Sequence, residues 1–278
     1  MSMPRDFLMV RHGKSEANIV QKDLKEGEHH PNAKEILARP DWQQKLSAEG
    51  ERQPLAAGRW LLENIGETAL KNAKKYHSPY IRARQTAALL GIPDGEGWLS
   101  DDRIVERSWG IYGTLSREEQ AQLFPMTTEH KEVNPWYVGM EGGESLSGGV
   151  LLRFRNFLDS LHREAADGTA IAVSHGEFMW VARYVLERMT PEAWEALDSD
   201  VSQTVRNCSI LHYSRVNPEN PEHVDDRLRW MRFIYPDAPE LSPYGGQWRE
   251  LEKPKYTTAA QLKDQTDKFE NLIVPKNS

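Results

Sequence analysis

The chain has 278 residues with 35 basic and 42 acidic side chains, which gives a formal net charge of −7. This excess of negative charge argues against a nucleic-acid partner and against binding to anionic membranes, so any anion site must be a local cluster of cations. No apolar run reaches the roughly 18 residues that span a membrane, and no leader pattern opens the chain. With one cysteine, Cys208, no intrachain disulfide can form. We therefore expect a cytoplasmic protein.

Three short strand-like runs are expected to form strands of one parallel sheet. They cover residues 7–10, 75–77 and 170–173, and longer stretches with helical spacing separate them. Strands that alternate with helices are typical of βαβ units, whose sheets are parallel. Two later apolar segments, 209–213 and 228–235, are expected to pair as a hairpin and to extend the sheet at an antiparallel edge.

Four segments carry the signals of helices. The first starts at Ser47, which can cap a helix. The second covers 81–90, the third covers 145–163, and the fourth follows Gly176 to about residue 189. We place one main domain over residues 1–235, with additions at about 21–45 and 125–143, and a tail over 236–278. Because the tail contains Trp248 and Tyr256, we expect it to pack on or near the domain.

Two of the expected strands end in a histidine followed by a glycine. Arg11-His12-Gly13 follows the first strand, and Ser174-His175-Gly176 follows residues 170–173. Ligands of open α/β sheets bind at the carboxyl ends of the strands, so the two pairs could share one site. A guanidinium presents a fork of donors to phosphate oxygens, and a neutral imidazole can act as a nucleophile. The pairing predicts phosphoryl chemistry without a metal.

Two further residues have side chains that suit this chemistry. Arg82 follows residues 75–77 and would lie in the first turn of the next helix, near its positive end. Glu106 lies between apolar residues and a glycine turn. The adjacent His29 and His30 are not expected to chelate a metal, because no cluster of cysteines or carboxylates with ligand spacing lies nearby.

Six motifs, in the same order, resemble those of the histidine phosphatase superfamily, most closely its phosphoglycerate-mutase-like branch. The resemblance runs from about Phe7 to Tyr213. It implies an α/β fold, a three-layer α/β/α sandwich with a mainly parallel sheet, and a catalytic main domain without a cofactor. The motifs are Arg11-His12-Gly13, Leu46-Ser47-Ala48-Glu49-Gly50, the stretch 78–87, the stretch 104–110, Gly142-Gly143-Glu144-Ser145-Leu146 and Ser174-His175-Gly176.

The resemblance also implies roles for single residues. His12 would be the nucleophile that becomes phosphohistidine, and Glu106 would be the general acid and base. The groups that would bind the phosphoryl oxygens are Arg11, Asn18, Arg82, His175 and Gly176. Glu177 stays open as a rival acid, because acid phosphatases of the same superfamily place their proton donor beside the second histidine.

The expected reaction is hydrolysis of a phosphomonoester, on a phosphorylated small molecule or on a phosphoprotein. Arg117, eleven positions after Glu106, matches a basic residue of the mutases, but the stretch 132–137 lacks their arginine pair. A cofactor-dependent phosphoglycerate mutase is therefore the alternative, and a non-catalytic module that binds a phosphorylated ligand is the third hypothesis. Trp136 and Tyr137 are candidates for contact with the substrate.

Overall fold

The computed structural model of the protein describes residues 2–28, 30–254, 256–271 and 273. Its centre is a seven-stranded sheet in the order β3-β2-β4-β1-β5-β8-β9. The parallel strands are β1 (Asp6–Arg11), β2 (Lys74–His77), β3 (Trp98–Ser100) and β4 (Thr169–Ser174). The antiparallel strands are β5 (Ile210–Ser214), β8 (Trp230–Ile234) and β9 (Arg249–Glu250). The mainly parallel sheet with an antiparallel edge is thus confirmed.

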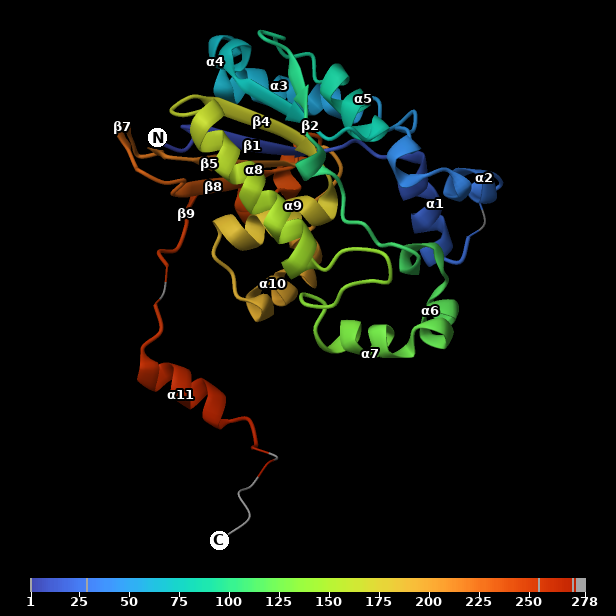
Figure 1. The fold of residues 1–278 in the computed structure, drawn as a ribbon. Coiled ribbons are helices and arrows are strands. Elements are labelled where there is room, and N and C mark those ends of the chain that lie inside the picture. Colours follow the sequence, from blue (N-terminus) through green and yellow to red (C-terminus); the bar gives the residue numbers. More distant parts are fainter. Residues whose placement is uncertain (1, 29, 255, 272, 274–278) are drawn as a thin grey trace.

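Helices cover both faces of the sheet, because the central strands are apolar on both sides (Figure 1). In β1, Phe7 and Met9 belong to one core cluster, and Leu8 and Val10 belong to the other, as the alternation of a strand requires. The helices on the first face are α8 (Leu151–Glu164) and α9 (Gly176–Leu186). Those on the second face are α3 (Gln53–Ile65), α4 (Glu67–Asn72) and α5 (Ile81–Leu89). The three-layer sandwich is therefore confirmed.

Three of the four expected helices lie where the sequence predicts them, and a π-helical turn (Leu146–Val150) precedes α8. The prediction of a helix start at Ser47 is wrong, because α3 begins at Gln53. The Ser47 hydroxyl donates to the Lys14 carbonyl over 2.9 Å and accepts the Gly50 N–H over 3.1 Å, which ties it into a turn against the first histidine loop.

The expected hairpin is also present, since β5 pairs with β8 in the register Ile210↔Ile234. The chain between them forms a smaller hairpin of β6 (Val216–Asn217) and β7 (Asn220–Val224). The other helices of the body are α1 (Glu16–Lys25), α2 (Ala33–Ala38), α6 (Arg117–Leu123), α7 (Pro125–Val133) and α10 (Pro191–Asp198). Short 3-10 turns cover Asp41–Gln43, Asp102–Ile104, Tyr112–Thr114, Val201–Gln203, Pro239–Leu241 and Pro243–Gly246. Figure 1 shows α1, α2, α6 and α7 beyond the carboxyl ends of the parallel strands.

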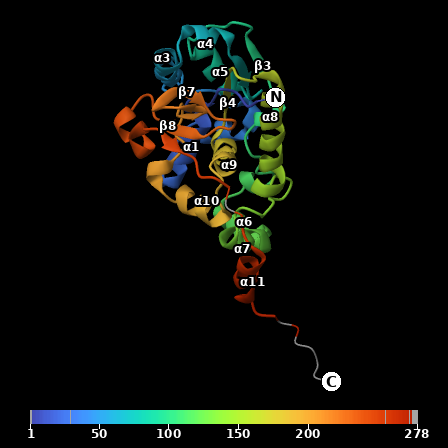
Figure 2. The same cartoon turned by 90° about the vertical axis from the view of Figure 1, so that its left-hand side faces the viewer.

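The tail packs on the sheet only in its first part. The Trp248 ring lies 4.7 Å from the His212 ring, and Leu251 is buried. Every described residue from Glu252 onward is exposed, and α11 (Ala259–Asp267) stands apart from the layers in Figures 1 and 2. The expectation of a packed tail is therefore wrong beyond Leu251, because α11 has no continuous apolar stripe to bury. Across the described residues, no helix has the length and apolar composition to cross a membrane.

Candidate active site

The carboxyl ends of three neighbouring strands meet at one edge of the sheet. β4 lies between β1 and β2, with Arg11 opposite Ser174 and His77 opposite Val173. His12 therefore follows β1, His175 follows β4, and Ser78 follows β2, all at the same level. The rings of His12 and His175 are buried and their centres are 5.0 Å apart. The structure thus brings the two strand-end histidines into one site.

The contacts of His12 define where its proton lies. Its Nδ1 is 2.7 Å from the Gly13 carbonyl, which can only accept, so Nδ1 carries the hydrogen and Nε2 keeps a lone pair. The Arg82 Nε–H donates to this Nε2 over 3.2 Å. Burial and the positive charges of Arg82 and Arg11 hold the pKa of His12 well below its usual value. A neutral imidazole with a lone pair at Nε2 is the form that a nucleophile needs.

The loop that carries His12 is held by backbone contacts. The Gly13 N–H donates to the Thr86 hydroxyl over 2.9 Å, and this hydroxyl donates to the Arg82 carbonyl over 2.7 Å. A Cβ atom on Gly13 would lie 2.4 Å from the Gly50 carbonyl oxygen, so only glycine fits where the loop meets the turn at residues 47–50. The helix that carries Arg82 is thereby tied to the loop that carries His12.

Arg11 and His175 each contribute a buried polar atom that has no partner among the described residues. These atoms are Arg11 Nε and His175 Nδ1. Arg11 Nη1 donates to the Val205 carbonyl over 2.5 Å, and His175 Nε2 lies 2.7 Å from the Ser78 hydroxyl. An unpaired buried polar atom costs about 1–3 kcal/mol, and an anion bound in the site would offer acceptors to both residues. Burial, with the positive charge of Arg82, lowers the pKa of His175 well below its usual value.

Gly176 and Asn18 lie beside these groups. Gly176 begins α9, where the first backbone N–H groups have no intrahelical acceptor, and a Cβ there would lie 3.4 Å from the Arg11 guanidinium. Asn18 Oδ1 accepts the Ser15 N–H over 3.2 Å in the cap of α1, and it also accepts from Asn207 Nδ2 over 3.3 Å. No hydrogen bond to another described residue engages Asn18 Nδ2, so this amide group can bind a ligand.

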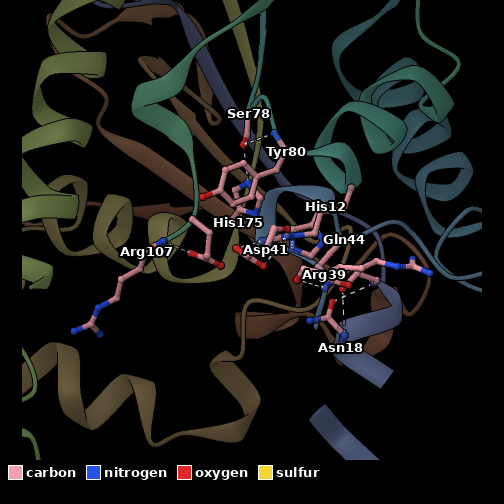
Figure 3. Close-up of polar contacts among 12 residues, drawn as sticks. His12, Asn18, Arg39, Asp41, Gln44, Ser78, Tyr80, Arg107 and His175 are labelled. Carbon is pink, nitrogen blue, oxygen red and sulfur yellow. Dashed lines mark hydrogen bonds and ion pairs between the residues drawn. The ribbon is translucent and has the colours of Figure 1, made fainter. Parts of the chain in front are cut away.

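Arg82 lies in the first turn of α5, as expected, and it is 4% exposed. Its two terminal nitrogens bind Asp41, from the 21–45 addition. Nη1 donates to the Asp41 carbonyl over 2.6 Å and to Oδ1 over 2.9 Å, and Nη2 donates to Oδ2 over 3.1 Å. Figure 3 shows Asp41 beside His12, near the centre of the site.

Two carboxylates border the histidines. Glu106 accepts the N–H of Arg107 over 3.0 Å, and burial raises its pKa against the opposing charges of Arg82 and Arg11. Burial and the negative charge of Glu106 raise the pKa of Glu177 to about 7. Arg107, whose Nη1 lies 3.5 Å from Glu177, opposes that rise. Both carboxyl groups are therefore biased towards holding a proton, as a general acid requires.

The three expected substrate contacts do not join this cluster. Trp136 is 3% exposed, and its ring stacks on Tyr184 with 3.8 Å between centres. The Trp136 indole therefore fills the core, and its contact with the substrate stays a prediction without support from this position. Tyr137 is 60% exposed, and Arg117 is exposed at the start of α6. In the described part of the chain, no hydrogen bond or ion pair joins either of these two residues to His12 or Glu106.

Four residues of the site were not predicted from the sequence. Ser78 follows a strand directly, so it carries the same signal as the two histidines. Asn207 donates to the His12 carbonyl over 3.0 Å, but it comes from the loop before β5, where no motif marks it. The Tyr80 ring lies 5.0 Å from the His175 ring and 5.0 Å from the Arg82 guanidinium carbon. Asp41 is the fourth of these residues. It lies in the 21–45 addition, which none of the six motifs covers.

The described residues contain no group of three or more histidine, cysteine, aspartate or glutamate side chains placed to hold a metal ion. His29 lies outside the described residues, so the prediction for the His29–His30 pair stays a prediction. Cys208 is buried and unpaired, within the core cluster on the α3–α5 face.

Comparisons with known proteins agree with this geometry. The sequence model of the histidine phosphatase superfamily (branch 1) matches residues 7–220. Phosphoserine phosphatase 1 of Hydrogenobacter thermophilus is 28% identical over 142 residues, which cover 46% of this chain and 67% of that protein. A mycobacterial glucosyl-3-phosphoglycerate phosphatase has a TM-score of 0.56 at 20% identity, over 82% of this chain and 96% of that one.

A putative alpha-ribazole-5'-P phosphatase of Escherichia coli K-12 has a TM-score of 0.56 at 17% identity, over 78% of this chain and 93% of that one. At these identities the two solved structures show that the fold is shared. The match of the family model spans both strand-end histidines, Arg82 and Glu106. The chain therefore belongs to the histidine phosphatase superfamily, branch 1, and is a phosphomonoesterase of the histidine phosphatase type.

Proposed function

We propose that the protein hydrolyses a small phosphomonoester in two steps, through a phosphohistidine on His12. The observation that carries the proposal is the buried, neutral His12, whose Nε2 keeps a lone pair beside Arg82. Nε2 attacks phosphorus, and the bond from phosphorus to the ester oxygen breaks. The departing oxygen takes a proton from Glu106. Water then attacks phosphorus, returns a proton to Glu106, and the electron pair of the phosphorus–nitrogen bond goes back to Nε2.

The cations around His12 would stabilise the transferring group. A phosphoryl group in transfer carries its charge on its equatorial oxygens, so fixed guanidinium groups lower the barrier. At an effective dielectric constant of about 20 and a distance of about 4 Å, one such contact contributes roughly 4 kcal/mol before desolvation is subtracted. Arg11 Nε and His175 Nδ1 are buried and have no partner in the described part of the chain, so they are the donors that this anion would engage first.

The names of the similar proteins support a small substrate. They refer to phosphoserine, glucosyl-3-phosphoglycerate and alpha-ribazole-5'-phosphate, each a small phosphorylated molecule. A phosphoprotein is the second candidate. We place the activity in the cytoplasm, where a free thiol such as that of Cys208 stays reduced.

A labelling experiment tests the phosphohistidine. Incubation with a radiolabelled aryl phosphate should give turnover and an acid-labile label on the wild-type protein, and His12→Ala should lose both. Turnover that survives in His12→Ala contradicts the mechanism. Phosphate binding without turnover in the wild type favours the binding module. Fast isomerisation of 3-phosphoglycerate in the presence of bisphosphoglycerate, with slow hydrolysis, favours the mutase.

The choice of acid needs a second experiment, because Glu177 also has a raised pKa, of about 7. We expect Glu106→Gln to lower kcat/KM for an alkyl phosphate by about 10²- to 10⁴-fold, the usual contribution of a general acid. The loss should be much smaller for a nitrophenyl phosphate, whose leaving group departs without a proton. Glu177→Gln is the matched control and should affect both substrates alike. If only Glu177→Gln shows the dependence on the leaving group, Glu177 is the acid.

A further inference from the structure

Arg82, which the proposed function assigns to phosphate, is already bound to a carboxylate. A guanidinium has five N–H donors. Four of these are used, one by His12 Nε2, two by the carbonyl and Oδ1 of Asp41, and one by Asp41 Oδ2. One donor is left, so a phosphate cannot bind Arg82 through a pair of oxygens until Asp41 moves away.

The Asp41 carboxylate also has the shape of the ligand that it excludes. Arginine binds carboxylate and phosphate with the same planar fork of two parallel N–H donors. Oδ1 and Oδ2 of Asp41 engage both terminal nitrogens of Arg82, over 2.9 Å and 3.1 Å. In Figure 3 the carboxylate lies beside His12, within the group of side chains that would surround the transferring phosphorus.

The segment that carries Asp41 is anchored outside the main core. Arg39 forms an ion pair with Glu16 over 2.7 Å, and Gln44 Nε2 donates to the Ile36 carbonyl over 2.7 Å. The apolar residues beneath this segment form a small cluster of their own, made of Ala17, Val20 and Ile36 with Ala33 against it. Because this cluster is separate from the two sheet-facing cores, residues 40–44 can shift without opening either of them.

Two further features favour a contact that can be released. Asp41 is 58% exposed and Trp42 is 52% exposed, so moving them away from Arg82 uncovers little apolar surface. Gln44 Oε1 is buried and has no partner among the described residues, so the closed position leaves one polar atom unsatisfied. Solvent also screens the exposed carboxylate, which limits the strength of the ion pair.

We propose that Asp41 is a built-in competitor of the substrate phosphate for Arg82, and that it thereby sets the affinity of the site for phosphate. This inference rests on the proposed function in one respect, namely that the site binds phosphate. The substrate displaces the Asp41 carboxylate when it binds. After hydrolysis the carboxylate returns to Arg82 and helps inorganic phosphate to leave.

The test is the dissociation constant of inorganic phosphate, measured by calorimetry without turnover. We expect Asp41→Asn, which keeps the shape and removes the charge, to bind phosphate about tenfold more tightly, equivalent to about 1.4 kcal/mol. Asp41→Ala should act in the same direction. Glu35→Gln is the matched control, because Glu35 is a 77% exposed carboxylate of the same addition that pairs with Arg39 instead. Its phosphate affinity should stay as in the wild type.

A second background shows whether the effect acts through Arg82. In Arg82→Ala, adding Asp41→Asn should bring no further gain in phosphate affinity. A gain that persists there, or phosphate binding in Asp41→Asn that is no tighter than in the wild type, overturns the inference. The absence of phosphate binding in all variants overturns it as well.

Steady-state kinetics separate this inference from the proposed function. In Asp41→Asn, KM for the substrate and the inhibition constant of phosphate should both fall, whereas a merely structural role would raise them. Tighter phosphate binding in Asp41→Asn without any hydrolysis would contradict the proposed function and leave the competitor role of Asp41 in place. Hydrolysis together with unchanged phosphate affinity in Asp41→Asn would contradict the competitor role of Asp41 and leave the proposed function in place.

Discussion

The protonation state of His12 depends on the groups packed against its ring. Nδ1 holds the hydrogen against the Gly13 carbonyl, and two arginines oppose a second proton on Nε2. A histidine at a strand end is in itself ambiguous, since a protonated ring would bind phosphate but could not attack it. Because of these neighbouring groups, His12 stays neutral and available as a nucleophile at pH values below its ordinary pKa of about 6.5.

Removing one of the neighbouring charges should change the pKa of His12. Arg82→Gln should raise the pKa of His12, because a positive charge that disfavours the imidazolium is lost. The acid limb of the profile of kcat/KM against pH should then move to higher pH, in addition to any loss in rate. The measurement is this profile, together with an NMR titration of the His12 ring.

Arg84→Gln is the control for this prediction, because Arg84 lies on the same helix but is exposed. It removes the same charge without contact with His12, so its acid limb should match that of the wild type. An acid limb that stays in place in Arg82→Gln would mean that burial and Arg11 hold the pKa of His12 down without Arg82.

Residues at strand ends could be predicted from the sequence, whereas those that arrive from elsewhere could not. His12, His175 and Ser78 follow strand-like runs that alternate with helices, and parallel pairing brings such ends together. Asp41 and Asn207 reach the site from loops whose positions depend on how neighbouring elements pack, which no local pattern encodes. The position of Trp136 could not be predicted either, because an aromatic pair in a loop is compatible with a core as well as with a binding surface.

The packing of α3 against α5 sets the position of the helix that carries Arg82. Gly58 of α3 lies against the Leu90 carbonyl, at the end of α5, and a Cβ on Gly58 would come within 1.6 Å of this oxygen. The obstacle is backbone, so no change of side-chain rotamer can relieve it. The close approach of the two helices therefore depends on the absence of a side chain at this position.

Gly58→Ala should destabilise the protein and lower its activity. Alanine favours a helix by about 1 kcal/mol over glycine, but forcing a methyl group into a packed contact typically costs about 1–3 kcal/mol or more. The clash with backbone places Gly58→Ala at the upper end of that range, so the net effect is a loss of stability. Urea unfolding measures it, with Gly168→Ala as the control, because the nearest atom to a Cβ on Gly168 is 3.6 Å away. Equal stability of the two variants would contradict the prediction.

Elements with strong periodic patterns could be predicted, and those decided by tertiary contacts could not. The apolar pattern predicts β1, β4, α8 and α9, whereas α5 is predicted by the stop signals Gly91 and Pro93 at its end. The start of α3 could not be predicted, because the Ser47 hydroxyl forms hydrogen bonds with the Lys14 carbonyl and the Gly50 N–H instead of capping a helix. β3 has only three residues, which is too short for a period. In the tail, Trp248 packs because the His212 ring is there to receive it, whereas Tyr256 is 91% exposed.

For the whole molecule, three buried histidines couple stability to pH. The pKa values of His12, His175 and His212 are lowered, in each case by burial first. Below about pH 6.5 the unfolded chain takes up protons that the folded protein does not, so the free energy of unfolding falls by up to roughly 1.4 kcal/mol per pH unit for each histidine. Glu106 and Glu177 act in the opposite direction, because their raised pKa values let the folded protein take up protons first.

His212 allows this coupling to be measured away from the active site. Its Nε2 lies 2.8 Å from Asp6 Oδ1, and its Nδ1 accepts from Arg232 Nε over 3.2 Å. Burial, helped by the charge of Arg232, lowers the pKa of His212 although Asp6 favours the protonated ring. His212→Gln cannot titrate, and the free energy of unfolding should fall less steeply between pH 7 and pH 5.5 than in the wild type, by up to about 1.4 kcal/mol per pH unit. Chemical denaturation at several pH values measures this slope, and His223→Gln on the exposed β7 is the control. Identical slopes in His212→Gln and the wild type would show that His212 takes up its proton equally well in the folded and unfolded chain, against the burial that surrounds it.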